Sequence, residues 1–256
     1  MKRRRWLTAP LALGLAAAVL LAACGGDDSR TLTVFAAASL TDAFQEISDR
    51  FEEEHPDVRV QFSFGGSQRL RFQLEQGAHA DVFASADQLQ LELAQAAGLV
   101  PRGPTLFVAN TVVLVVPASN PANLSGLNDL LSRQVRLVIA GPAVPAGRAT
   151  REALQAAAIL DAVLASVVSE EDNVRAVLTK VVVGEADAGF VWRTDALAAG
   201  ADVLQFPQPT AVASGYGIAR TTDARDAGLA DAFVAFVRSR DGLAVLIEAG
   251  FLPAAN

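Results

Sequence analysis

The sequence predicts an α/β protein with two mixed, mostly parallel sheets, because short apolar strands alternate with helical segments along the chain. Residues 31–36, 111–116 and 135–140 are apolar or β-branched runs of strand length. Several such runs lead through small residues into segments with helical periodicity. Apolar residues make up 52% of the 256-residue chain, so nothing after residue 30 has the composition of a disordered segment.

The first predicted strand runs directly into a helix start. Residues 31–36 lead through two alanines into Ser39, and Ser39 and Asp42 have the S-x-x-D spacing of a capping box. We therefore expect Ser39 to cap a helix that extends to about Phe51. The unpaired N–H groups and partial positive charge of a helix start suit an anion. Most capping serines bind no ligand, so this feature alone is weak.

The same arrangement recurs along the chain, which strengthens the prediction. Residues 58–64 alternate as a strand and lead through two glycines to Ser67. Residues 135–140 lead into a loop rich in glycine and proline, and Ala146 lies near the next helix start. A fourth helix begins near Val174. Ligands of α/β sheets bind beyond the carboxyl ends of the strands, where these four helix starts are expected to converge.

The remaining elements complete the alternation. The strand at 111–116 is expected to pass between two domains, and the strand at 211–219 is expected to cross back. The other predicted strands are 81–84, 184–191 and 203–206, and the other predicted helices end near 97 or cover 127–131, 151–158, 223–238 and 240–249.

The first residues have the pattern of a bacterial lipoprotein signal. Residues 2–5 are basic, residues 6–23 are almost wholly apolar, and small residues precede Cys24. Cys24 is the single cysteine, which excludes an internal disulfide and a cysteine-rich zinc site. We expect cleavage before Cys24, lipid on its sulfur and a polar tether over 24–30. The alternative is an ordinary signal peptide with an incidental cysteine.

The charge of the mature chain argues against nucleic acid as a partner. Residues 1–23 hold four of the 21 basic residues and none of the 28 acidic ones, so without them the net charge is −11. Proteins that bind polyanions carry the opposite balance. A small anion is expected to bind through local hydrogen-bond donors, because the overall field repels it.

Four segments together resemble the molybdate-binding proteins of bacterial ABC importers. These segments are 34–40 (VFAAASL), 80–87 (ADVFASAD), 144–148 (VPAGR) and 184–196 (GEADAGFVWRTDA). The match is collinear over about residues 31–253. The resemblance implies the type II periplasmic-binding-protein fold, in which two lobes joined by a two-strand hinge close on an oxyanion. The lobes would comprise 31–112 plus 216–256 and 113–215.

The resemblance also implies the ligand contacts and the partners. The hydroxyls of Ser39 and Ser67, the backbone amides of Ala146 and Val174 and the side chain of Trp192 would donate to molybdate or tungstate. The family commonly has Tyr at the last position, and an indole N–H donates but cannot accept. The protein would act as an exported monomer, periplasmic or lipid-anchored to the outer face of the membrane. It would deliver its ligand to a permease with a cytoplasmic ATPase and need no cofactor.

Two other functions stay open from the sequence. Sulfate has the same four acceptor oxygens, so donor chemistry does not separate it from molybdate. A lipid-anchored hydrolase is disfavoured, because neither histidine has a spaced partner and no G-x-S-x-G or Walker-type loop is present. If the serines are not the donors, the guanidinium groups of Arg148, Arg175 and Arg193 are the next candidates.

Overall fold

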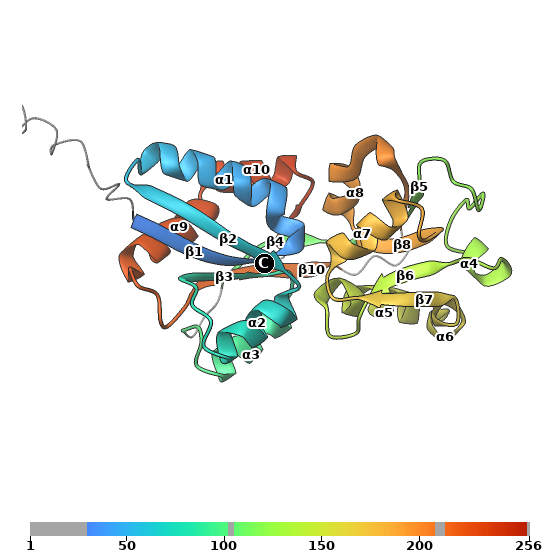
Figure 1. Ribbon diagram of the computed structural model, residues 1–256, viewed down its shortest axis with the longest axis horizontal. Helices are drawn as coiled ribbons and strands as arrows, with labels where there is room; N and C mark the ends of the chain where they lie inside the picture. The colour runs from blue at the N-terminus through green and yellow to red at the C-terminus, as the bar shows by residue number, and fades with distance from the viewer. Residues whose placement is uncertain (1–29, 102–104, 208–212, 255–256) are drawn as a thin grey trace, which may run out of the picture.

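The computed structural model describes residues 30–101, 105–207 and 213–254. Within these ranges the strands form a six-stranded and a five-stranded sheet, each covered by helices on both faces. We call the halves built on these sheets the first lobe and the second lobe (Figure 1). The predicted signal peptide and Cys24 lie outside the described residues.

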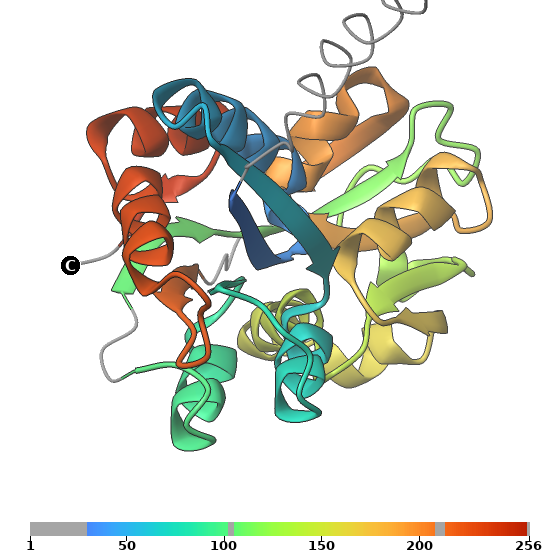
Figure 2. The same cartoon turned by 60° about the vertical axis from the view of Figure 1, so that its left-hand side comes forward.

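The first lobe holds the six-stranded sheet. Strands β3, β1 and β2 are parallel, and β11, β4 and β10 pair antiparallel. Helices α1, α9 and α10 pack on one face and α2 and α3 on the other, as Figure 2 shows from a second direction. In spatial order the strands are β11 (Leu252–Pro253), β4 (Thr105–Asn110), β10 (Ser214–Arg220), β3 (Val82–Ser85), β1 (Arg30–Ala37) and β2 (Val58–Gly65). The helices are α1 (Thr41–Glu54), α2 (Ser67–Glu75), α3 (Gln88–Ala96), α9 (Ala227–Val237) and α10 (Arg240–Glu248), with the 3-10 turn η1 (Ala38–Leu40) before α1.

The second lobe holds the five-stranded sheet. Strands β7, β6 and β8 are parallel, and β5 and β9 pair antiparallel beside them. Helices α7 and α8 cover one face, while α5 packs on the other with α6 and α4 beyond it. The strands in order are β7 (Val167–Glu171), β6 (Leu137–Ala140), β8 (Ala188–Trp192), β5 (Val112–Pro117) and β9 (Val203–Pro207). The helices are α4 (Asp129–Ser132), α5 (Pro145–Ala156), α6 (Leu160–Leu164), α7 (Val174–Val182) and α8 (Arg193–Ala199), followed by the 3-10 turn η2 (Gly200–Asp202).

The chain crosses between the lobes twice. It leaves the first sheet at the end of β4 and enters the second at the start of β5, only one residue later. It leaves the second sheet after β9 and returns to the first with β10. These crossings join the lobes, in agreement with the two-strand hinge predicted from the sequence.

Each lobe has apolar side chains on both faces of its sheet. Phe44, Phe51 and Phe233 interlock edge to face under α1 and α9, and a separate cluster that includes Phe83 fills the space under α2 and α3. In the second lobe, Phe190 belongs to the cluster under α5 and α6. This packing makes each sheet a firm base for the loops that leave its strand ends.

The sheets are mixed, as predicted, but their antiparallel share is larger than the sequence indicates. Of the strand pairings, four are parallel and five are antiparallel. Most of the antiparallel pairings involve the strands next to the two crossings, which are β4, β5, β9 and β10. Strand β4 has no counterpart among the predicted elements. Strand β7 is also missing there, because its Ser169 and acidic residues resemble a helix start.

The predicted capping box at Ser39 is wrong. Ser39 lies inside the turn η1, and neither η1 nor α1 has a side-chain cap. The Ser39 hydroxyl instead lies 2.8 Å from the Tyr216 hydroxyl on β10. A partner 177 residues further along the chain therefore replaces the local bond that the spacing suggested.

Candidate functional site

The candidate site lies where the parallel strands of both lobes end and face each other. In the first lobe, β1 and β2 run parallel with Ala37 opposite Gly65, so Ser39 and Ser67 emerge side by side. In the second lobe, β6 and β7 lead to Ala146 and Val174, and β8 ends at Trp192. All five residues predicted to contact the ligand line one cavity between the lobes.

This cavity is small and its lining carries no formal charge. The centre of a water-sized sphere can move through a volume of ≈ 10 Å³ inside it. This is about the space that one water molecule needs. A larger ligand therefore requires the lobes to separate slightly. The lining residues are Ala37, Ala38, Ser39, Gly65, Gly66, Ser67, Ala86, Val144, Pro145, Ala146, Asn173, Val174 and Trp192.

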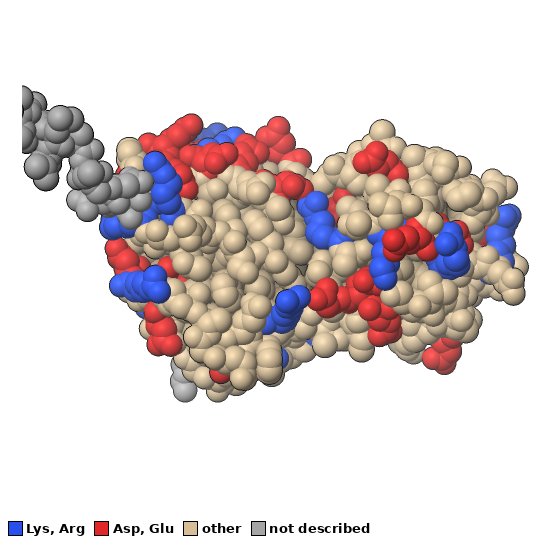
Figure 3. All heavy atoms as spheres, viewed as in Figure 1, with Lys and Arg blue, Asp and Glu red and all other residues tan. Residues whose placement is uncertain are grey.

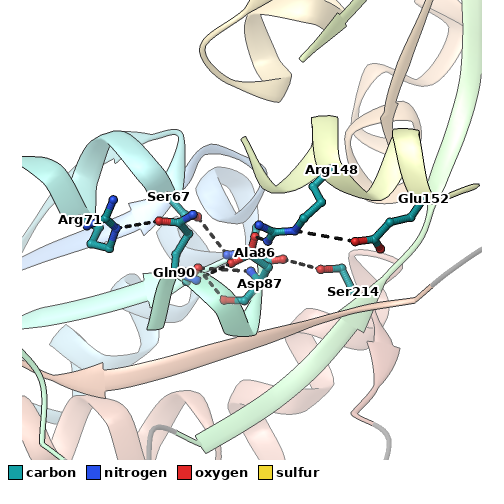
Figure 4. Close-up of polar contacts among 9 residues, drawn as sticks. Ser67, Arg71, Ala86, Asp87, Gln90, Arg148, Glu152 and Ser214 are labelled. Atoms are coloured by element: carbon teal, nitrogen blue, oxygen red, sulfur yellow. Dashed lines mark hydrogen bonds and ion pairs between the residues drawn. The ribbon is translucent and has the colours of Figure 1, made fainter. Parts of the chain in front are cut away.

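Ser67 is held by a backbone donor from its own lobe. The N–H of Ala86 donates to Ser67 Oγ at 3.0 Å, and the serine is 1% exposed (Figure 4). Ser67 is the first residue of α2 and Gly66 is the N-cap, so the hydroxyl does not cap the helix. Because the oxygen already accepts a bond, its hydrogen remains for a ligand in the cavity.

Two helices of the second lobe begin at the same cavity. Val174 begins α7, and the side chain of Asn173 caps that helix by accepting from the N–H of Ala176. Ala146 follows Pro145 at the start of α5. N–H groups in a first helical turn have no acceptor within the helix, and the helix dipole adds partial positive charge there. The arrangement suits an anion.

Trp192 closes the second-lobe side of the cavity. It is 1% exposed, and its ring meets the Tyr216 ring edge to face with centroids 5.8 Å apart. The sequence predicts that its indole N–H donates to the ligand, and this role stays a prediction. Its place at the end of β8 keeps the ring between the two lobes.

The arginines considered as alternative clamps have protein partners and do not line the cavity. Arg148 on α5 forms an ion pair with Asp87 of the first lobe, which Figure 4 shows beside Ser67. Burial raises the pKa of Asp87, while Arg148 and the N–H of Gln90 oppose this shift. Arg193 donates to the carbonyl oxygen of Gly250 at 2.6 Å. These guanidinium groups therefore join the lobes.

Arg175 pairs with one carboxylate from each lobe. Its Nη2 lies 2.5 Å from Asp42 on α1, and its Nε lies 2.6 Å from Asp195 on α8. Asp195 is fully buried, and burial raises its pKa to about 7 although Arg175 opposes the shift. Burial also disfavours the charge on Arg175, but Asp195 and Asp42 outweigh it and raise the Arg175 pKa.

Further contacts bring the lobes together at the opposite side of the cavity. Gln68 and Arg69 on α2 donate to the carbonyl and carboxylate oxygens of Asp172 at 2.8 and 3.0 Å. A Cβ on Gly66 would overlap the Asp172 carbonyl oxygen, so this approach requires glycine. In Figure 3, basic and acidic side chains meet along the seam between the lobes. The lobes are therefore in contact around the cavity.

A larger groove adjoins the cavity at Ser39 but has a different character. It encloses ≈ 590 Å³ between α1 and α10 of the first lobe and α7 and α8 of the second. Its lining combines Asp42, Arg175 and Glu248 with apolar side chains such as Leu178 and Phe251. It lacks the convergent uncharged donors of the small cavity, so we place the candidate ligand site in the smaller space.

Neither a metal site nor a membrane span is found in the part of the chain that the structure describes. Over those residues no group of three or more His, Cys, Asp and Glu side chains could hold a metal ion. No helix there is long and apolar enough to cross a membrane. The buried carboxylate of Asp81 accepts from the backbone N–H groups of Thr33 and Arg225 and so has a structural role.

Tyr216 and Asn110 are site residues that sequence reasoning missed. Tyr216 contacts Ser39, and the side-chain amide of Asn110 lies beside the tyrosine hydroxyl. Both are fully buried on strands of the first lobe. The one available signal is that Tyr216 is the single tyrosine, placed in a strand expected to cross between domains.

Two sheets with parallel and antiparallel strands, two crossings and a cavity between the strand ends define a two-lobed binding protein. The model of the family described as bacterial extracellular solute-binding protein matches residues 32–252. The chain therefore belongs to this family, whose members carry solutes.

One curated relative is the molybdate-binding protein ModA of Mycobacterium bovis. It is 40% identical over 263 residues, which is 96% of this chain and 98% of the relative. This match confirms the resemblance seen in the sequence.

Two solved structures share the fold. The periplasmic molybdate-binding protein of Azotobacter vinelandii superposes with a TM-score of 0.77 at 22% identity, over 88% of this chain and 100% of that one. The sulfate-binding protein SubI from Mycobacterium tuberculosis gives a TM-score of 0.82 at 20% identity, over 88% and 87%. At these identities the likeness establishes the fold alone.

Proposed function

We propose that this protein binds molybdate, and with it tungstate, in the small cavity between the lobes. The main support is that the five predicted contact residues line one cavity, whose lining has hydrogen-bond donors but no charged side chain. Fully ionised molybdate has four acceptor oxygens and no hydrogen to donate. A site made of donors fits such an anion, whereas a protonated phosphate would leave its own hydrogen without an acceptor. The likeness to ModA over nearly the whole chain supports the same ligand.

Within this proposal the donors have defined roles. The hydroxyls of Ser39 and Ser67 donate from the first lobe, and the backbone N–H groups of Ala146 and Val174 donate from the second. The Trp192 indole supplies a further donor. We infer a carrier without catalytic turnover, because the site lacks a nucleophile paired with a base among its lining residues.

Sulfate is the second candidate ligand. It satisfies the same donors, and a sulfate-binding protein shares the fold. The distinction rests on cavity size, since sulfate is the smaller tetrahedral anion. The greater sequence similarity to a molybdate-binding relative favours molybdate.

The proposal extends to closure and to delivery. We propose that the lobes comprise 31–112 plus 216–256 and 113–215, and that they close around the ligand by a hinge motion. The loaded monomer would then deliver its ligand to a permease coupled to a cytoplasmic ATPase. Ion pairs between the lobes, such as Arg69 with Asp172, would favour the closed form.

The proposed location follows from the first residues of the sequence. Processing before Cys24 and attachment of lipid to its sulfur would anchor the protein at the outer face of the membrane. A diacyl anchor has two chains, which suffices for stable attachment. Cys24→Ser is expected to release the protein or leave it unprocessed. Normal processing with unchanged membrane retention would contradict the anchor but leave the ligand unaffected.

Calorimetric titration of the purified mature protein with molybdate, tungstate, sulfate and phosphate tests the proposed function. We expect tight binding of molybdate and tungstate and much weaker binding of sulfate and phosphate. Preference for sulfate would establish the second candidate. Absence of binding to all four anions would overturn the proposal.

A further inference from the structure

The contact between Ser39 and Tyr216 bears on how the site tells one oxyanion from another. The two hydroxyl oxygens are 2.8 Å apart, and either group can be the donor when this pair is considered alone. If Ser39 donates to Tyr216, its hydrogen is not available for the ligand. The direction of this one hydrogen bond therefore decides whether Ser39 presents a hydrogen or a lone pair to the cavity.

Asn110 sets the direction. Its Oδ1 accepts from the N–H of Thr111 at 2.9 Å, which fixes the amide so that its NH₂ group faces the other way. That NH₂ group donates to Thr194 Oγ1 at 2.8 Å and makes a longer contact of 3.5 Å with the Tyr216 hydroxyl. The tyrosine oxygen thus faces a donor on this side. Its own hydrogen is then directed to Ser39.

The tyrosine is held rigidly and keeps its hydrogen. Its ring packs edge to face against Trp192 and against Phe251, with the latter centroid 5.2 Å away. The side chain is fully buried, and burial raises the pKa of Tyr216 well above its usual value. The hydroxyl therefore remains a donor over the whole working range of pH.

We propose that Tyr216 is a specificity-determining positioning residue that donates to Ser39 Oγ and so commits the Ser39 hydrogen to the bound anion. Tyr216 does not line the cavity itself and acts through Ser39. The inference rests on the proposed function, since it assigns the role of Ser39 toward an oxyanion.

Ser67 shows the same design with a different partner. There the backbone N–H of Ala86 occupies the serine oxygen, and the hydrogen is left for the cavity. With both serines committed as donors, each directs its hydrogen into the cavity. An anion that carries its own hydrogen, such as hydrogenphosphate, must direct it to a serine oxygen that already accepts one bond, and this poorer match disfavours it.

The test compares molybdate with inorganic phosphate in Tyr216→Phe, which removes one oxygen and keeps the ring. In this variant Ser39 can accept as well as donate. We expect molybdate affinity to fall about tenfold, which corresponds to about 1.4 kcal/mol, and phosphate affinity to change little or to rise. The ratio of the two affinities is the readout, because a general loss of structure would lower both. An unchanged ratio would overturn the proposal.

Thr221→Val is a matched control. Thr221 follows β10 directly, is 3% exposed and donates to the Ala80 carbonyl oxygen, away from the cavity. The Thr221→Val variant therefore loses a buried hydroxyl from the same lobe and leaves the contacts of Ser39 unchanged. We expect both affinities to stay at the parent values. A ratio that falls as far as in Tyr216→Phe would show that buried hydroxyls in general matter, and would contradict the specific role.

Two further measurements separate the possible failures. In a Ser39→Ala background, Tyr216→Phe should leave the ratio unchanged, because the residue it acts through is gone. If Tyr216→Phe does not fold, Asn110→Asp places an acceptor beside the tyrosine hydroxyl and should lower the ratio with the tyrosine in place. If the parent binds no molybdate, the proposed function fails. If the parent binds molybdate and these variants keep the parent ratio of molybdate to phosphate affinity, the proposed role of Tyr216 is wrong and the proposed function stands.

Discussion

In the proposed site the first lobe supplies side-chain hydroxyls, while the second lobe supplies backbone N–H groups and the Trp192 indole. The first lobe contributes the hydroxyls of Ser39 and Ser67, each of which can donate or accept. The second lobe contributes backbone N–H groups at Ala146 and Val174, whose direction is fixed by the helices α5 and α7. The hydroxyls thus need partners that set their direction, namely Tyr216 and the Ala86 amide. A hydroxyl donor therefore needs a second residue behind it that orients its hydrogen, whereas the N–H of a helix start does not.

Removal of both hydroxyls of the first lobe is expected to have the largest effect. A hydrogen bond to a charged group contributes about 1.5–3 kcal/mol, so Ser39→Ala with Ser67→Ala should weaken molybdate binding at least a hundredfold. Each single variant should lose roughly tenfold to a hundredfold. Calorimetric titration measures both.

Stability must be followed in the same variants. Loss of Ser39 or Ser67 leaves the Tyr216 hydroxyl or the Ala86 N–H with one partner fewer, which costs roughly 1–3 kcal/mol of stability. Melting without ligand separates this cost from the loss of binding. Folded double variants that bind molybdate as tightly as the parent would show that the anion site lies elsewhere.

A proline at the start of α7 tests the backbone donors of the second lobe. Val174 is the first residue of the helix, where proline is well tolerated, and the extended backbone of Asn173 suits the residue before a proline. Val174→Pro removes the N–H, while Val174→Ala shortens the side chain and keeps it. We expect Val174→Pro to bind molybdate roughly tenfold to a hundredfold more weakly than Val174→Ala. Equal affinities for the two would exclude this N–H as a ligand contact.

Two neighbouring glycines test how closely the two sets of donors must approach. A Cβ at Gly66 would overlap the Asp172 carbonyl of the other lobe, whereas a Cβ at Gly65 would meet only the Leu70 side chain at 3.5 Å. Gly66 has an extended backbone that alanine can adopt. Since overpacking costs about 1–3 kcal/mol, Gly66→Ala should weaken molybdate binding about tenfold. Gly65→Ala should stay near the parent, and similar losses in both would argue against a requirement for lobe contact at Gly66.

The last prediction concerns stability and not ligand binding, and it rests on the buried carboxyl group of Asp195 on α8. Burial raises the pKa of Asp195 to about 7 from an unfolded value of 3.8. Between these pH values the folded protein holds a proton that the unfolded chain has released. The free energy of unfolding should therefore fall as pH rises from about 4 to 7 and level off above 7. Asp195→Asn should flatten this slope in denaturant titrations at a series of pH values.

Asp42→Asn is the control for this pH dependence. Asp42 pairs with the same arginine but is largely exposed, with 57% of its side chain accessible. Its variant should change the slope much less than Asp195→Asn does, because Asp42 is a minor cause of the raised Asp195 pKa. If Asp195→Asn keeps the slope of the parent, another buried group is responsible for the pH dependence.

The sequence predicts the elements of the site better than it predicts their partners. The strand-to-helix turns at Ser67 and Val174 are local features, so their position follows from residues close together in the chain. Ser39 was predicted as a cap because S-x-x-D spacing is also a local signal. Its partner Tyr216 lies 177 residues away, and no local pattern reports such a contact. Tertiary structure overrode the local preference at this position.

Strand direction was predicted less well for a related reason. Periodicity identifies a strand but not its neighbour, so the antiparallel pairing of β10 with β3 and β4 is invisible in the sequence. Strand β7 (Val167–Glu171) is short, and its serine and two glutamates are typical of a helix start, so the sequence does not indicate a strand there. Their places in the sheets depend on contacts between distant segments.

The position of β10 has a consequence for the order in which the chain assembles. This strand lies between β3 and β4, although more than a hundred residues of sequence separate it from them. The five-stranded sheet, in contrast, is built from one continuous stretch between Val112 and Pro207. As the polypeptide emerges from its amino end, the second lobe has all its strands while the first still lacks β10 and β11. The lobe that carries Ser39 is therefore the last to be completed, and Tyr216 arrives with its inner strand, ahead of α9, α10 and β11.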